Sequence, residues 1–195
     1  GDRANDWILD EFAKIKEEHG NKDRRPRIEH SQHLSRSAVP RFGAENIIPS
    51  MQPYHVYDDG AWAHKRIDHD RLSRTYVFKT LIESGANLTF GSDWTVAPLN
   101  PMTGIYAAIT RHTRDGKNPD GWYPDEKISI EDILKCYTMN NAYAGFWDKT
   151  TGSITAGKNA DFVVHSVNLL TATPEEILHN KVLRTVVGGT DHIFK

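Results

Sequence analysis

This sequence contains almost no cysteine. It also has no long apolar run and no large excess of charge of one sign. The 195 residues include a single cysteine, Cys136, which excludes an internal disulfide framework and any metal site built from several thiolates. No apolar run approaches the roughly 20 residues that a membrane-spanning helix needs. The formal net charge of −2 gives no general attraction to nucleic acid or anionic membranes. We therefore expect no nucleic-acid partner, no membrane partner and a cytoplasmic location.

The beginning of the sequence also lacks the features of a natural N-terminus. Residues 1–6 contain no initiator methionine and no signal-peptide pattern, and a helical pattern follows almost at once. This start predicts a chain cut from something longer. The composition itself is that of an ordinary globular protein, with 38% hydrophobic and 26% charged residues. Ten histidines make a metal site or an acid–base site worth seeking.

Helical and strand patterns alternate up to about residue 150. Short strands are predicted at residues 27–30, 46–52 and 87–90, although Pro49 weakens the second of them. Helical patterns are predicted at residues 6–19, 34–41 (weakly), 73–85, 100–112 and 129–137, with polar loops after residue 53 and over 113–127. Residues 151–195 read mainly as β-structure, with one helical stretch at 174–179. We therefore place a domain boundary near residue 150.

Alternating helices and strands predict an α/β fold with a parallel sheet or barrel. A closed (β/α)8 barrel needs about 250 residues, so three strands are too few to close one. In such folds, ligands bind and catalysis occurs at the carboxyl ends of the strands.

Three of the predicted strands end in polar side chains: His30 after the first, Gln52 and His55 after the second, and Asp93 after the third. A histidine and an aspartate at two such ends can converge on one metal ion, and the aspartate can also accept a proton from water. Taken singly these residues are weak signals, because a lone histidine is more often a surface or hydrogen-bonded residue and a Gly-Ser-Asp sequence is more often a plain turn. Their equivalent placement after successive strands is what favours a site.

Several ordered motifs support a family resemblance. Residues 27–32 (RIEHSQ), 50–55 (SMQPYH) and 90–101 (FGSDWTVAPLNP) resemble three consecutive motifs of the amidohydrolase superfamily. The likeness is to its amidohydrolase 3 branch, which includes N-substituted formamide deformylase and the exoenzyme regulatory protein AepA. Residues 121–124, 137–144 and 152–164 also fit. The resemblance covers essentially the whole chain, and it is specific for the family but not for a substrate.

The resemblance implies a metal-dependent hydrolase with a (β/α)8 TIM-like barrel and a small composite β-sandwich. Residues 1–150 would hold about the last three strand–helix units of the barrel, and residues 151–195 the C-terminal part of the sandwich. One or two divalent metal ions, zinc being the expected metal, would bind at the barrel mouth of the intact enzyme.

The resemblance also assigns roles to individual residues. His30 matches the metal-ligating histidine after the sixth barrel strand. Asp93 matches the aspartate after the eighth strand, which is both a metal ligand and the general base. Gln52 and His55 would lie where the seventh strand meets the substrate, and Trp62 and Trp94 would form pocket walls.

Family members are much longer, and their remaining metal ligands lie upstream of the part that this chain matches. We therefore expect the C-terminal portion of an amidohydrolase that hydrolyses a non-peptide, amide-type C–N bond of a small molecule through metal-activated water. Because the chain offers two good ligands and catalytic zinc needs three, we expect the isolated chain to bind zinc weakly and to lack activity. The alternatives are a non-catalytic regulatory or interaction protein on the same scaffold and a free-standing α/β binding module.

Two structural expectations follow. His30 and Asp93 should lie at the carboxyl ends of adjacent parallel strand units and face one cavity. A partial barrel should also leave a free strand edge and bared apolar side chains, with four candidates: Ile28, Ile48, Leu88 and Phe90. Covering them would require a homo-oligomer or association with the missing N-terminal half.

Overall fold

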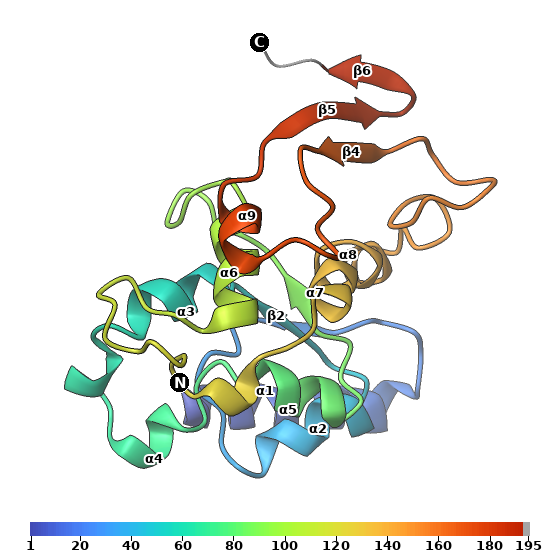
Figure 1. The fold of residues 1–195 in the computed structure, drawn as a ribbon. Coiled ribbons are helices and arrows are strands. Elements are labelled where there is room, and N and C mark those ends of the chain that lie inside the picture. Colours follow the sequence, from blue (N-terminus) through green and yellow to red (C-terminus); the bar gives the residue numbers. More distant parts are fainter. Residues whose placement is uncertain (193–195) are drawn as a thin grey trace.

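Two separate three-stranded sheets organise the chain (Figure 1), which a computed structural model describes over residues 1–192. The first sheet is parallel, in the order β1 (Arg27–Glu29), β2 (Ile48–Met51), β3 (Thr89–Phe90). The second is antiparallel, in the order β4 (Phe162–His165), β5 (Val182–Val187), β6 (Thr190–His192). The predicted α/β class is confirmed, whereas barrel closure and a composite sandwich stay predictions.

Helices surround the parallel sheet, and α1, α2 and α5 lie together beneath it in the view of Figure 1. The helices preceding β3 are α1 (Asp2–His19), α2 (Ala38–Ala44), α3 (Tyr54–Asp59), η1 (Ala63–Lys65), α4 (His69–Leu72) and α5 (Phe78–Glu83). Those after it are α6 (Met102–Thr110), η2 (Pro124–Glu126), α7 (Ile130–Tyr137), α8 (Met139–Ala144) and α9 (Pro174–Leu178). No helix in this described part of the chain has the length and hydrophobicity that a membrane crossing requires.

Local sequence signals account for several element boundaries. The Ser129 side chain accepts a hydrogen bond from the backbone N–H of Asp132 at 3.1 Å, which caps α7. Thr173 and Glu176 form a reciprocal capping box at the start of α9. Pro49 is tolerated in the central strand because pairing with β3 begins only at Ser50, so its missing N–H precedes that ladder.

Three expected element positions differ from the structure. The weak helix expected over residues 34–41 forms later, as α2. The region after residue 53, expected to be a polar loop, contains α3, η1 and α4, and the predicted loop over 113–127 contains η2. The chain then turns at Thr138, which separates α7 from α8 with φ −124° and ψ −84°.

The four side chains expected to be bared are buried within this one chain. Ile28, Ile48, Leu88 and Phe90 are 6%, 1%, 0% and 2% exposed. The helices supply the cover: the Phe90 ring, for example, packs edge-to-face against Phe78 of α5 at 5.0 Å between centroids. These side chains therefore need no partner to cover them, contrary to expectation, and association with another chain stays a prediction.

Two asparagine side chains of α8 cover the outer edge of β3. Asn140 Nδ2 donates to the carbonyl oxygen of Leu88 at 2.8 Å, and Asn141 Nδ2 donates to that of Phe90 at 2.9 Å. The carbonyl group of the residue between them, Thr89, faces β2. Successive carbonyl groups of a strand point to opposite sides, so those of Leu88 and Phe90 lie on the edge that no described strand covers. Side-chain amides thus provide the hydrogen bonds that a further strand would otherwise supply.

A candidate metal centre at the carboxyl ends of the parallel strands

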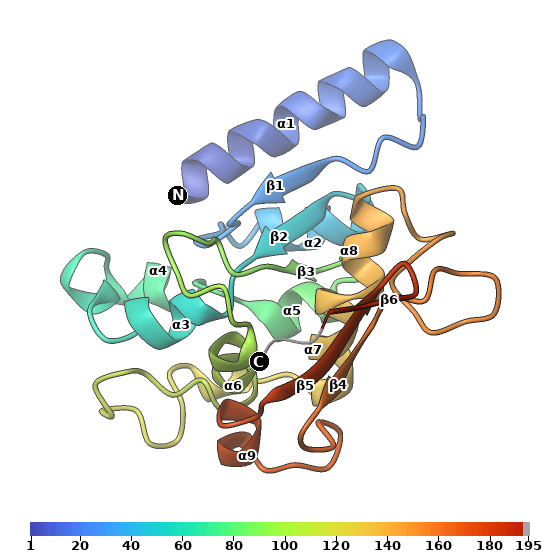
Figure 2. The ribbon, with the colours of Figure 1, turned by 90° about the horizontal axis from the view of Figure 1, so that it is seen from above.

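Three predicted site residues meet at one edge of the parallel sheet. Figure 2 shows its strands side by side, with α3 beyond the carboxyl end of β2. His30 follows β1 directly, and Asp93 lies three residues beyond β3. His30, His55 and Asp93 each offer one ligand atom, and these atoms lie within 4.8 Å of one another. The expectation of adjacent strands is wrong, because β2 lies between β1 and β3.

His30 is held by its backbone and its neighbours. Its φ of 68° places it in the left-handed region, which costs a non-glycine residue of order 1 kcal/mol and is common at functional sites. Its backbone N–H donates to the Ser50 carbonyl at 2.7 Å, and the Ser31 hydroxyl donates to the Ile28 carbonyl at 3.1 Å. These bonds turn the chain sharply after β1 and direct the imidazole toward the strand ends.

Gln52 contacts His30 and is itself buried. Its Oε1 lies 2.9 Å from His30 Nδ1, so Nδ1–H donates and Nε2 keeps a free lone pair. A hydrogen bond of this kind fixes both the tautomer and the orientation of a metal-ligating imidazole. Gln52 therefore supports His30 in the structure, and its expected contact with substrate stays a prediction.

His55 lies in the first turn of α3, where its backbone N–H donates to the Gln52 carbonyl at 3.1 Å. Its Nε2 lies 3.3 Å from Asp93 Oδ2, and its side chain is 14% exposed. Gly104 lets α6 approach this turn closely, because a Cβ at that position would lie 3.5 Å from the backbone nitrogen of Tyr54 and 2.5 Å from Tyr137 Oη. Packing of α6 thus sets the position of His55.

Asp93 begins a tight loop. It has φ 58°, and its carbonyl accepts hydrogen bonds from the N–H groups of Val96 at 2.8 Å and Ala97 at 3.2 Å. Its carboxylate side chain is 30% exposed and so remains accessible. Both strand-end residues of the centre, His30 and Asp93, therefore adopt left-handed backbone conformations fixed by local hydrogen bonds.

The two tryptophans expected to line a substrate pocket are both exposed. Trp94 follows Asp93 directly and is 65% exposed, and Trp62 precedes η1 and is 37% exposed. Val96 and Leu99, which belong to the 90–101 motif, are exposed in the same loop as Trp94.

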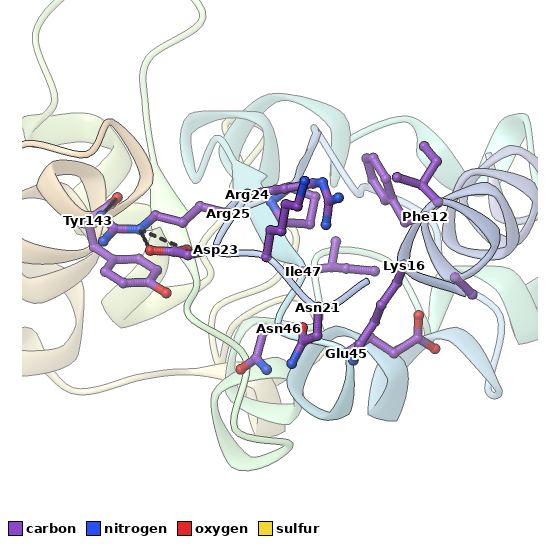
Figure 3. A pocket seen from close by; sticks show the side chains of 14 residues that line it. Phe12, Lys16, Asn21, Asp23, Arg24, Arg25, Glu45, Asn46, Ile47 and Tyr143 are labelled. Atoms are coloured by element: carbon purple, nitrogen blue, oxygen red, sulfur yellow. Dashed lines mark hydrogen bonds and ion pairs between the residues drawn. The ribbon is translucent and has the colours of Figure 1, made fainter. Parts of the chain in front are cut away.

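A separate pocket of about 600 Å³ opens at the opposite ends of the strands (Figure 3). It lies where residues 24–26 lead into β1 and Ile47 leads into β2, beside α1. One of its lining cations, Arg25, forms ion pairs with Asp23 and Asp148, and its guanidinium carbon lies 4.0 Å from the centroid of the Tyr143 ring. None of the predicted site residues lines this pocket.

The donor set of His30, His55 and Asp93 suits a divalent metal. Two imidazole nitrogens and one carboxylate oxygen are ordinary zinc ligands, and together with the metal they leave a net charge of about +1. The only thiol, Cys136, does not belong to this group, and its burial raises the pKa of the thiol to about 12. These residues therefore fit a zinc-type ion held by nitrogen and oxygen.

Known proteins resemble this chain along nearly its whole length. Protein LONG AFTER FAR-RED 3 of Arabidopsis thaliana is 40% identical over 190 residues, covering 97% of this chain and 32% of that protein. N-substituted formamide deformylase of Arthrobacter pascens is 25% identical over 193 residues, covering 97% of this chain and 34% of the deformylase. The crystal structure of an uncharacterized metal-dependent hydrolase from Pyrococcus horikoshii OT3 matches with a TM-score of 0.76 and 25% identity, covering 90% of this chain and 34% of that one.

The chain thus spans about a third of the length of these curated relatives. A family model described as the amidohydrolase family (Amidohydro_3) matches residues 1–190. The motifs, the α/β fold and the strand-end site agree with this match, and the chain belongs to the amidohydrolase family, in its amidohydrolase 3 branch.

Proposed function

We propose that this chain is the C-terminal part of a metal-dependent amidohydrolase that cleaves an amide-type C–N bond, other than a peptide bond, in a small molecule. The observation that carries the proposal is the convergence of His30, His55 and Asp93 at the carboxyl ends of parallel strands. Membership of the family and the similarity to a formamide deformylase support the type of bond. The coverage of about a third of each relative supports a longer enzyme.

In this proposal His30 and Asp93 hold the metal, with Gln52 fixing the His30 ring. A divalent metal bound there polarises the scissile carbonyl and lowers the pKa of water. The Asp93 carboxylate accepts a proton as the water oxygen bonds to the carbonyl carbon, and it returns that proton to the nitrogen as the C–N bond breaks. The products are a carboxylic acid and an amine, and the exposed loop after Asp93 provides apolar contacts for the substrate.

The test uses the protein encoded by the complete reading frame, with N-substituted formamides and other small amides as substrates. We expect acid and amine release that a chelator abolishes. We expect His30→Gln and Asp93→Asn each to lower kcat/KM by about 100-fold or more. His64→Gln is the matched control, since His64 is exposed and lies in η1. An Asp93→Asn enzyme with full activity would contradict the assigned role, and residues 1–195 alone are expected to be inactive.

The second candidate function is a non-catalytic protein on the same scaffold. It is favoured by one observation: the relative with 40% identity, LONG AFTER FAR-RED 3, bears a name that states no enzymatic activity. The same assay separates the two candidates. A longer protein that binds metal but hydrolyses none of the amides would favour the interaction protein.

A further inference from the structure

The carboxylate of Asp59 joins α3 to two other segments of the chain. Asp59 is the last residue of α3, and its Oδ2 accepts two hydrogen bonds. Gln32 Nε2 donates to this oxygen at 2.8 Å, and the Tyr76 hydroxyl donates to it at 2.6 Å. Tyr76 is 1% exposed, and burial raises the pKa of its hydroxyl, which therefore stays protonated and donates. A single oxygen atom thus receives both donors.

Gln32 belongs to the same turn of the chain as His30. It lies two residues after His30, and its backbone carbonyl accepts a hydrogen bond from the N–H of Tyr76 at 2.9 Å. The next residue, His33, forms a β-bridge with Thr75, and its Nδ1 lies 2.8 Å from Thr75 Oγ1. The turn that carries His30 is therefore fixed to the segment that carries Tyr76, and the two donors reach α3 from one assembly.

Tyr76 is also held from a second side. Its φ of 55° is left-handed, and its carbonyl accepts a hydrogen bond from Arg111 Nη1 at 2.9 Å. Arg111 is 0% exposed, and its Nε donates to the Trp122 carbonyl at 2.6 Å. Because the guanidinium binds two backbone carbonyl groups, the Tyr76 backbone has little freedom to move. The Tyr76 hydroxyl is therefore a fixed point of attachment for α3.

Asp59 and His55 lie on the same face of α3. They are four positions apart, and residues with this spacing project to the same side of a helix. His55 Nε2 lies 3.3 Å from Asp93 Oδ2. Packing of α6 at Gly104 holds the beginning of α3, and Asp59 holds its end. Because α3 has only six residues, a helix released at Asp59 also moves the imidazole of His55.

We propose that Asp59 is a positioning residue, whose carboxylate fixes α3 to the turn after β1 and so sets the place of His55 relative to His30. The inference rests on the site of the proposed function, and it concerns a side chain outside the group of His30, His55 and Asp93. The role requires an acceptor atom and not a charge, because both hydrogen bonds end on one oxygen. Asparagine can provide that oxygen, whereas leucine cannot.

The experiment uses the whole 195-residue chain without added metal. Nuclear Overhauser cross-peaks between the imidazole protons of His30 and His55 report the separation of the two rings, whose ligand atoms lie within 4.8 Å of each other in the structure. Circular dichroism checks that each variant folds. A general loss of stability does not remove such cross-peaks from a chain that is still folded, so the measurement separates positioning from a merely structural role.

The variants are Asp59→Leu, Asp59→Asn and Gln32→Leu. Asp58→Asn is the matched control, because Asp58 lies in the same helix but pairs with Arg114 at 2.6 Å. We expect Asp59→Leu and Gln32→Leu to lose the cross-peaks, and Asp59→Asn and Asp58→Asn to keep them. In the longer protein, Asp59→Leu should lower kcat and kcat/KM by the same factor, about 10- to 100-fold, because a displacement of about 1 Å misaligns the reacting groups.

Several results would overturn the inference. One is the presence of the cross-peaks in folded Asp59→Leu; if that variant does not fold, their presence in Gln32→Leu has the same meaning. Others are their absence from the unmodified chain, and their loss in Asp59→Asn or in Asp58→Asn. Failure of the proposed function is a different result, namely no hydrolysis by the unmodified longer protein, and the cross-peaks of the 195-residue chain do not depend on it.

Discussion

The asparagines that cover the edge of β3 provide a sharp test of how the short parallel sheet is stabilised. β3 has two residues and leads directly to Asp93, so its stability bears on the metal centre. Replacing Asn141 with leucine keeps a similar side-chain volume and removes the N–H that donates to the Phe90 carbonyl. Asn140→Leu does the same for the Leu88 carbonyl.

The magnitude follows from the burial of the two acceptors. Leu88 and Phe90 are 0% and 2% exposed, so water does not readily replace a lost donor. A buried carbonyl left without a partner costs about 1–3 kcal/mol, so each single substitution should lower the free energy of unfolding by that amount. With a urea m-value of about 2 kcal/mol per molar, each substitution should lower the midpoint by about 0.5–1.5 M.

The assay is urea unfolding followed by circular dichroism, combined with hydrogen exchange at the Gly91 amide, which donates to the Met51 carbonyl. Exposed Asn159→Leu is the control and should change the free energy of unfolding by less than about 0.5 kcal/mol. We expect the double variant Asn140→Leu/Asn141→Leu to lose protection at Gly91. A double variant with unchanged stability and unchanged exchange would refute the reasoning, because the edge would then be held by something else.

Three further predictions concern packing, pH and reactivity. Gly104→Ala should destabilise the chain by about 1–3 kcal/mol in urea unfolding, because the new Cβ would lie 2.5 Å from Tyr137 Oη, whereas Gly91→Ala meets open space and should cost less. Burial lowers the pKa of His33, so the unfolded chain binds a proton more readily than the folded chain does. Melting temperatures should therefore fall as the pH drops below about 6.5, and His33→Gln should reduce that fall. An equal fall in the variant would contradict a role of His33 in this pH dependence. Burial raises the pKa of the Cys136 thiol to about 12, so a thiol reagent at about pH 8 should label it only on unfolding, and rapid labelling of the folded chain would contradict this.

Sequence patterns predicted the three parallel strands and most helices because each of these signals is local. The helical patterns, the strand patterns and the polar residues after each strand all lie within a few positions of the structure that they specify. Helix α3 was missed because a six-residue helix that follows Pro53 gives no apolar stripe long enough to recognise. The break at Thr138 likewise depends on how α8 packs, as its asparagines contact β3.

The sequence patterns predicted the individual residues of the candidate site, but they could not predict the distances between those residues. His55 and Asp93 are 38 positions apart in sequence, and their 3.3 Å contact depends on how α3 packs against α6. The burial of Ile48 and Phe90 is also a tertiary effect, since helices from both sides of each strand in sequence provide the cover. Sequence reasoning gave the candidate residues, and packing decided which side chain touches which.

Because of the register of the parallel sheet, the metal centre is sensitive to the number of residues in each strand. Glu29 is paired with Ser50, and Met51 with Phe90, so His30, Gln52 and the loop to Asp93 leave the sheet within one residue of the same level. A slip of one residue would turn Gln52 to the opposite face of the sheet, because side chains alternate along a strand. Insertions or deletions of a single residue within β2 should therefore abolish the centre even where conservative substitutions are tolerated. Spacing within the strands, and not residue type alone, is thus a requirement of the centre.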